Sequence, residues 1–457
     1  MAMKNKILVI LLMLFSLAVT AQPLSLDECF RLAQENNKQI RSRQAQTKQA
    51  TYTVKAQRAN YLPDIALTGS GYWNNSKGTL LNIPETYLPC YDMMTETPIQ
   101  TSLAALFPGT TIGYEIGTIM RGGVSVTQPV YTGGKITSAY RMAQTAEKMS
   151  KLQETQTQQS VWIEVAEAYT LLVRAQEMQQ VAQQHHALLD KLLHDVQSAV
   201  RHGMKIHNDE LKVQVRLNES ELALHRADNA RRLAAKNLCQ LIGQPYDENF
   251  AVEGILPKYD GDRMFETHLE DRPEFQMLDC QDEIASQQMR LVRSEMLPQV
   301  GLQGNYNYMH GLKVDDATVL DGGSFSVVLN VSIPLYHFGG RSNKVKAAQA
   351  KMEQVELERQ DLVEKMQLEL SQATDNLDEA RLEAELAVKS LSQAEENLQL
   401  SRKQYEAGME SISDLLEAQT LWQQAFAAKV ETDCALYLTH IKYLKATGLT
   451  PGEYFGK

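Results

Sequence analysis

The sequence has few of the features by which enzymes and metal proteins are usually recognised. Its 457 residues include only 5 cysteines, which are scattered without a CxxC pair. This scatter excludes a zinc ribbon and a disulfide scaffold. A P-loop, a G-x-S-x-G elbow, an H-E-x-x-H motif and a complete G-x-G-x-x-G fingerprint are all missing. We therefore expect no enzyme activity, no catalytic residues, no metal site and no cofactor.

An excess of basic residues is also missing. The chain has 56 acidic against 45 basic residues and a net charge of −11, which argues against a nucleic-acid partner. Beyond the N-terminal segment no run approaches 18 consecutive apolar residues, so no transmembrane helix is expected. The regular spacing of Leu, Val, Ile and Ala argues against disorder.

The first 21 residues predict export. Lys4 and Lys6 precede an apolar run at 7–19, and Val19-Thr20-Ala21 places small residues where signal peptidase cuts. We interpret residues 1–21 as a signal peptide and exclude them from the fold. The mature chain is then either soluble outside the cytoplasm or spans a membrane by strands.

An internal duplication is the most informative feature of the sequence. The matched segments are 62–69 with 297–304 at an offset of 235, and 129–131 with 334–336 and 203–204 with 408–409, both at 205. The first copy therefore carries about 30 extra residues before position 129, an insertion that suits a loop.

The duplication sets the expected domain boundaries. The first repeat covers 22–242, a linker covers 243–271 and the second repeat covers 272–457. Each repeat has a helix, a strand hairpin and two long helices. The hairpins are expected at about 63–131, with a long outer loop at 74–109, and at about 298–336. The long helices are expected at 135–202, 209–242, 341–407 and 414–447, with Asn208 and Ser413 as N-caps.

The expected strands alternate apolar and polar residues. Between Phe325 and Ile333 every second residue is apolar, and only Val328 interrupts the polar set. This pattern fits both a half-buried soluble sheet and a membrane barrel with lipid outside and water inside. Four strands cannot close such a barrel, and open edges in lipid would leave backbone groups unpaired. The pattern therefore requires an oligomer without fixing its number of chains.

The long helices carry a heptad repeat. Between Gly340 and Gly408 lie 67 residues without Pro or Gly, enough for a helix of roughly 100 Å. Two rows repeat every seven residues and form an a/d seam: Leu370, Leu377, Ala384, Leu391, Leu398 and Tyr405, and Ala373, Ala380, Ala387, Ala394 and Ser401. Such a seam predicts a left-handed coiled coil or the wall of a helical tube.

Together these motifs resemble those of the TolC family of outer-membrane efflux proteins. The resemblance rests on the paired Leu-Pro strand starts and on three further motifs, which are Leu24-Ser25-Leu26-Asp27-Glu28 with Ala33 and Asn36-Asn37, Pro129-Val130-Tyr131 with Gly133-Gly134-Lys135, and Tyr405 with Gly408 and Asp414. It implies an α+β membrane protein, a homotrimer whose four strands per chain form a 12-stranded transmembrane β-barrel in outer-membrane lipid. A long α-helical barrel would continue it through the periplasm. The linker 243–271 and the C-terminal segment would form an equatorial band.

The same resemblance implies a function. The chain would be the passive outer-membrane channel of a tripartite efflux or type I secretion system, exporting small molecules or proteins. Its partners would be a periplasmic adaptor, also called a membrane fusion protein, and an inner-membrane pump. The alternative is a structural or adhesive coiled-coil protein of the periplasm or surface, which has no need for two matched strand hairpins.

Acidic residues near one helical turn are the candidate gate. Asp414 and Glu417 lie three residues apart and share a helix face, and Asp209 is the first-copy counterpart of Asp414. The resemblance implies that Asp414 and Glu417 form rings that narrow the periplasmic entrance, and that Tyr405 helps to hold it shut. The resemblance also implies a basic residue near position 410, but Glu410 is acidic, so that link must differ here or be absent. Alternatively, these acids only complement a helix dipole.

Two further features have both functional and ordinary interpretations. The resemblance implies that the turns contact the adaptor through Gly203, Met204, Gly408 and Met409; the ordinary interpretation is a plain helix hairpin. Five histidines fall between His185 and His207, where His186 and His194 could share a face and bind a metal. The ordinary interpretation is a solvated helix surface, because no carboxylate or cysteine joins them at ligand spacing.

Overall fold

A computed structural model of the chain describes residues 23–90, 104–247, 250–254, 256, 269–311, 313–314, 317–319 and 321–449. The expected signal peptide lies outside the described residues, as do parts of the expected outer loop and linker. The chain forms two compact units. The first unit comprises the residues up to Thr51, Thr145–Asp282 and the residues from Glu353 on. The second unit comprises Tyr52–Gln144 and Glu283–Met352.

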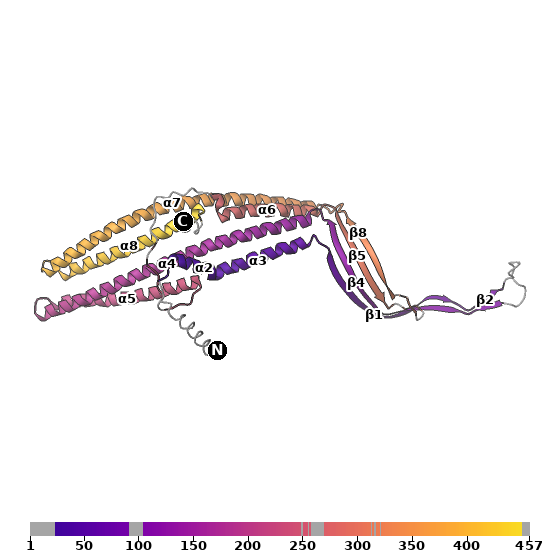
Figure 1. The fold of residues 1–457 in the computed structure, drawn as a ribbon, viewed down its shortest axis with the longest axis horizontal. Helices are drawn as coiled ribbons and strands as arrows, with labels where there is room; N and C mark the ends of the chain where they lie inside the picture. The colour runs from indigo at the N-terminus through magenta and orange to yellow at the C-terminus, as the bar shows by residue number, and fades with distance from the viewer. Residues whose placement is uncertain are drawn as a thin grey trace, which may run out of the picture. The chain divides into compact units, whose positions relative to one another are not determined.

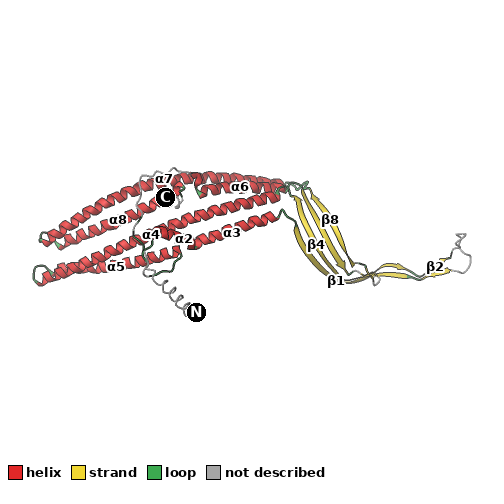
Figure 2. Cartoon of the chain, viewed as in Figure 1, coloured by secondary structure: helices red, strands yellow, loops and turns green. Residues whose placement is uncertain are grey.

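The second unit is built on an antiparallel sheet of four long strands and two short ones (Figures 1 and 2). The long strands, in sheet order, are β1 (Asp64–Ile83), β4 (Thr110–Tyr131), β5 (Gln299–His310) and β8 (Asp321–Ser332). Among the described residues β1 pairs only with β4, and β8 only with β5. All 12 residues of β8 are exposed in the single chain. The sheet therefore ends in two open edges that further strands must cover.

The segment expected as one outer loop is largely strand where the structure describes it. β1 and β4 stay paired from Asn74 opposite Gly117 to Ile83 opposite Thr110, well beyond the end of β5. Further out, β2 (Thr86–Pro89) pairs with β3 (Ala104–Phe107). The prolines of this segment suggested a loop, but its Thr, Tyr, Ile and Leu residues favour strands. Pro89 is accommodated because it ends a strand. We call residues 76–115 the outer hairpin.

Replacing the outer hairpin by a two-residue Asn-Gly turn should leave membrane insertion and trimer assembly intact. The second copy closes its own hairpin between β5 and β8 without such an extension, and the two-residue turn suits antiparallel strands. Among the described residues, the other strand that pairs with the outer hairpin is the short β6 (Lys313–Val314), opposite Glu115 and Tyr114. Native mass spectrometry and the yield of membrane-inserted trimer test this. Loss of insertion would identify the outer hairpin as a packed plug.

The helices repeat in length as well as in sequence. The first copy has α2 (Leu26–Asn36), α3 (Lys38–Ala59), α4 (Lys135–Arg201) and α5 (His207–Ile242), and the second has α6 (Pro273–Ser294), α7 (Gly340–Glu406) and α8 (Ile412–Thr447). α4 and α7 have 67 residues each, and α5 and α8 have 36 each. None of the described helices combines the length and apolar composition needed to cross a bilayer.

The first unit has a core shared by both copies. Cys29 of α2, Tyr169 of α4, Leu238 of α5 and Ile441 of α8 all belong to one cluster and are almost fully buried. Leu24 pairs in parallel with Val252, so the described part of the linker also packs against this core. The alternating Leu and Ala seam of α7 is buried at Leu377, Ala380, Ala384 and Ala387. All five cysteines are free, and burial raises the pKa of Cys29 to about 12.

Candidate functional site

Two glycine turns close the long helices of the first unit, between α4 and α5 and between α7 and α8. Gly203 and Gly408 adopt left-handed φ angles of 74° and 71°. In each turn the glycine N–H donates to the carbonyl three residues back, and the following methionine N–H donates to the carbonyl five residues back, at 2.8 to 3.0 Å. This double bond pattern is a Schellman motif, which glycine favours. Met204 and Met409 are 70% and 74% exposed, so both turns present an apolar side chain to solvent.

The returning helices begin differently from what we expected. Ser411 rather than Ser413 caps α8. The Asp414 N–H donates to Ser411 Oγ at 3.3 Å, and the Ser411 N–H donates to Asp414 Oδ2 at 3.1 Å. α5 has Ile206 at its N-cap position and no side-chain cap, so Asn208 is not a cap. Both helices begin two residues before their expected starts. The S-x-x-D spacing was the signal for the true cap of α8.

Asp414 and Glu417 are both exposed on α8, but their surroundings differ. Hydrogen bonds from the Ser411 side chain and backbone lower the pKa of Asp414, so its carboxylate is a helix cap as well as a surface charge. Glu417 lines a groove of about 730 Å³ between α5 and α8, together with Lys212 and Arg216. Glu219, which pairs with Arg216 at 2.8 Å, lines the same groove, so side chains of both charges surround Glu417.

Two lysines connect the hairpins of one chain at their turns. Lys205 Nζ lies 4.8 Å from the centroid of the Tyr405 ring. Lys212 Nζ donates to Ser413 Oγ at 3.0 Å and lies 4.0 Å from Asp209 Oδ1. Burial raises the pKa of Tyr405, and the charge of Asp209 adds to this effect. We call Lys205, Tyr405, Lys212 and Ser413 the tip links. Sequence reasoning missed both lysines, because no spacing pattern joins residues about 200 positions apart.

Glu410, the acidic residue at the expected latch position, is bound within its own hairpin. The hydroxyl of Ser401 on α7 donates to Glu410 Oε2. Ser401 is 4% exposed, so this bond lies against the helix wall. Lys205 and Lys212, by contrast, contact the other hairpin through the tip links.

An apolar cluster beneath the turns packs the two hairpins together. We call this the tip cluster, and its buried members are Leu189, Val196, Val213, Ile412, Leu415 and Leu416. They come from α4, α5 and α8, and Leu398 and Tyr405 of α7 pack against them. All four long helices therefore meet in this cluster.

The histidines near the turns have ordinary partners. His186 Nδ1 lies 3.0 Å from Ser220 Oγ, and His207 Nδ1 lies 2.9 Å from Glu210 Oε2. Burial lowers the pKa of His185, which favours its neutral form. Within the described part of the chain, no three His, Cys, Asp or Glu side chains are placed to hold a metal ion.

Comparison with known proteins identifies the family. The family model for outer membrane efflux proteins matches residues 30–244 and 265–448, and the chain belongs to this family. The outer membrane protein TolC of Vibrio cholerae serotype O1 is 23% identical over 347 residues, which cover 73% of this chain and 69% of TolC. The CmeC outer membrane channel of Campylobacter jejuni superposes with a TM-score of 0.73 at 17% identity, covering 93% of this chain and 85% of CmeC. The open-state MtrE outer membrane channel of Neisseria gonorrhoeae superposes with a TM-score of 0.70 at 16% identity, covering 93% of this chain and 89% of MtrE.

This family membership confirms the expected class and fold. The protein is an outer-membrane efflux channel and not an enzyme. It has the fold of the trimeric channels, in which a β-barrel is continued by a long helical barrel in the periplasm. The open edges of β1 and β8 agree with this, because four strands per chain close only when copies pool them. Members of the family are homotrimers that work with adaptors and inner-membrane pumps.

Proposed function

We propose that the ends of the four long helices form the periplasmic gate of this channel. Asp209, Asp414, Glu417 and Tyr405 are its central residues. The observation that carries the proposal is the pair of tip links, which join the α4–α5 hairpin to the α7–α8 hairpin at their turns. Opening the channel would separate these hairpins. The tip links lie at the turns, so these two side-chain contacts are placed to oppose that separation.

The carboxylates beside these links would select the permeating ion. A trimer brings three copies each of Asp414 and Glu417 to one level, with Asp209 nearby. A narrow passage lined by one sign of charge concentrates counter-ions, since field strength rises where walls are close and water is limited. The closed tip should therefore favour cations and bind multivalent cations.

The exposed turns are the proposed adaptor contact. Gly203, Met204, Gly408 and Met409 project beyond the capped helix ends, and both methionine side chains are largely exposed. Methionine is flexible and polarisable, and such residues are common on surfaces that adapt to a partner. We assign these turns to a periplasmic adaptor, which would open the tip on behalf of the inner-membrane pump.

The double variant Asp414→Asn with Glu417→Gln should lose cation selectivity in planar bilayers and become less sensitive to trivalent cations added from the periplasmic side. The amides remove charge but keep oxygen acceptors, so the Ser411 cap survives. Trimer stability should change little, because Asp414 is an exposed first-turn acid, which contributes about 0.3–1 kcal/mol, and Glu417 is an exposed acid beyond that turn.

The matched control is Glu395→Gln with Glu396→Gln, which removes the same charge from exposed positions within α7. It should leave selectivity and block nearly unchanged. If the tip variant behaves like this control, Asp414 and Glu417 are only helix-start residues, and the constriction lies elsewhere. If the trimer dissociates, they are structural contacts.

A further inference from the structure

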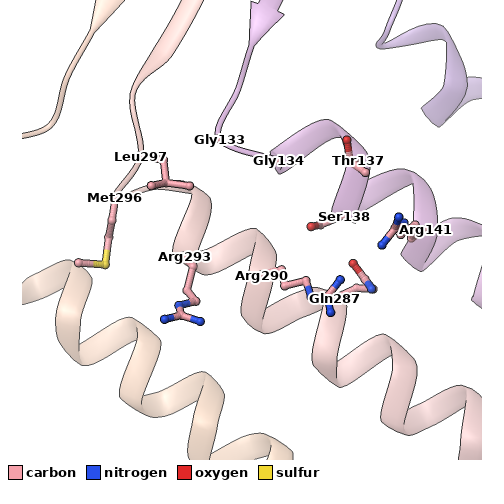
Figure 3. A pocket seen from close by; sticks show the side chains of 10 residues that line it. All are labelled: Gly133, Gly134, Thr137, Ser138, Arg141, Gln287, Arg290, Arg293, Met296 and Leu297. Atoms are coloured by element: carbon pink, nitrogen blue, oxygen red, sulfur yellow. The ribbon is translucent and has the colours of Figure 1, made fainter.

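A groove in the second unit lies where the strands meet the helices. It has a volume of about 620 Å³ and lies between the first turns of α4 and the last turns of α6. Figure 3 shows the guanidinium groups of Arg141 and Arg290 on either side of the Gln287 side chain, with Arg293 pointing away from them. We call this site the junction groove. Nothing in the gate proposed above uses it.

The junction groove is suited to an anion. None of Arg141, Arg290 and Arg293 pairs with a carboxylate among the residues that the structure describes. Other arginines of the same chain do so, for example Arg359 with Asp279 at 3.2 Å. The groove also holds the N-terminal turn of α4, a helix of 67 residues whose dipole attracts negative charge at this end. Two independent features therefore favour a phosphate at one place.

The same groove holds a buried acceptor that lacks a donor. Gln287 is 2% exposed, and its Nε2 donates to Glu283 Oε1 at 2.7 Å. Among the described residues, its Oε1 has no hydrogen-bond partner. A buried oxygen without a hydrogen-bond donor destabilises the fold, because it has lost its hydrogen bonds to water and gained none in return. A ligand with an ammonium group beside its phosphate would donate to Gln287 Oε1 and lie near the Glu283 carboxylate.

The height of the groove matches a membrane interface. All four strand–helix junctions of the unit expose large apolar or aromatic side chains, which are Tyr61 and Leu62, Val130 and Tyr131, Met296 and Leu297, and Leu335, Tyr336 and Phe338. Such girdles mark the boundary between lipid tails and head groups in outer-membrane barrels. Met296 and Leu297 also line the groove, so an acyl chain could lie beside them.

A second copy of the chain is not the occupant. The groove lies between α4 and α6, which continue from β4 and into β5, the two central strands of the sheet. Neighbouring chains of the trimer would join at the open edges, β1 and β8. The groove therefore lies away from the contacts between chains of the trimer.

We propose that the junction groove binds a zwitterionic phospholipid head group of the periplasmic leaflet. The phosphate would be held by Arg141, Arg290 and the start of α4. The primary ammonium would donate to Gln287 Oε1. The ligand is thus of the phosphatidylethanolamine class, with one site per chain.

Native mass spectrometry of the purified trimer in detergent tests this with three probes, phosphatidylethanolamine, phosphatidylglycerol and inorganic phosphate. The wild-type trimer should bind up to three phosphatidylethanolamine molecules, more tightly than phosphatidylglycerol, and phosphate should not displace them. The variant Arg141→Gln with Arg290→Gln should bind about 25-fold more weakly, because each basic residue near a lipid head group contributes roughly fivefold. Gln287→Leu should abolish the preference for phosphatidylethanolamine.

The matched control is Arg226→Gln with Arg232→Gln, two exposed arginines of α5. Equal lipid affinity of the junction and control variants would overturn the proposal. Displacement of the lipid by inorganic phosphate at comparable concentration would also overturn it, because the ligand would then be a soluble anion. If the double variant does not assemble, Arg290→Gln alone supports the same comparison.

Discussion

The variant Leu189→Ala should loosen the closed tip and raise the single-channel conductance. Leu189 has no exposed surface and lies in the tip cluster that joins α4, α5 and α8. Truncating a buried leucine usually costs about 2–5 kcal/mol, because the cavity collapses only in part. Lys205 and Tyr405 are only half-buried, and their contact contributes about 0.5–2 kcal/mol. The tip cluster, rather than the tip links, should therefore dominate closure.

Two measurements separate this expectation from general destabilisation. Hydrogen exchange should accelerate at the ends of the four long helices and stay unchanged in the core around Tyr169. Leu171→Ala is the matched control, since Leu171 lies on the same helix and is 48% exposed. Unchanged conductance in a variant with faster exchange at the tip would show that the tip cluster does not hold the channel shut.

Acidification should destabilise the first unit through His440. This residue of α8 is 5% exposed, and burial together with the nearby Arg381 charge lowers its pKa from 6.5 to about 4. Because the unfolded chain then binds a proton more readily than the folded chain, the stability is fully present above pH 6.5. It should fall as the pH drops from 6.5 towards 4, by about 3 kcal/mol per chain in total.

The variant His440→Gln isolates this contribution. Carboxylates that titrate in the same range do so in both proteins, so the difference between their unfolding free energies at pH 7 and pH 4.5 reports on His440. His202→Gln is the control, because His202 is exposed, follows the last residue of α4 and contacts the Ser198 carbonyl of that helix through Nδ1. Equal pH dependence in wild type and His440→Gln would contradict the expected cause.

The architecture could be predicted from the sequence because periodic patterns of residues determine it. The heptad rows of α7 and the duplicated glycine turns are local, and each copy confirms the other. The second copy of each long helix starts and ends 205 residues after the first, which is the offset of the sequence motifs. Alternation in β8 left two interpretations open, and the unpaired edges of the sheet together with the family match decide between them.

The candidate site was less accessible, because it depends on side chains distant in sequence. Asp414 was singled out as an acid near a turn, and the structure shows that it also completes a capping box with Ser411. Lys205 was not noticed at all, since its partner Tyr405 lies in the other copy. The role of the acids as a gate stays a prediction that the bilayer experiment tests.

The sequence by itself determined the duplicated plan, the lengths of the helices, the glycine turns and the need for copies to complete the sheet. These follow from local backbone preferences and from hydrophobic periods, which a single chain carries along its length. Only the tertiary structure decided that Lys205 and Lys212 tie the hairpins, that Ser411 caps α8 and that the expected outer loop continues as strands. It also placed Arg141 beside Arg290 and Gln287, residues about 150 positions apart. Such juxtapositions arise when helices pack, and no spacing within one helix encodes its neighbour.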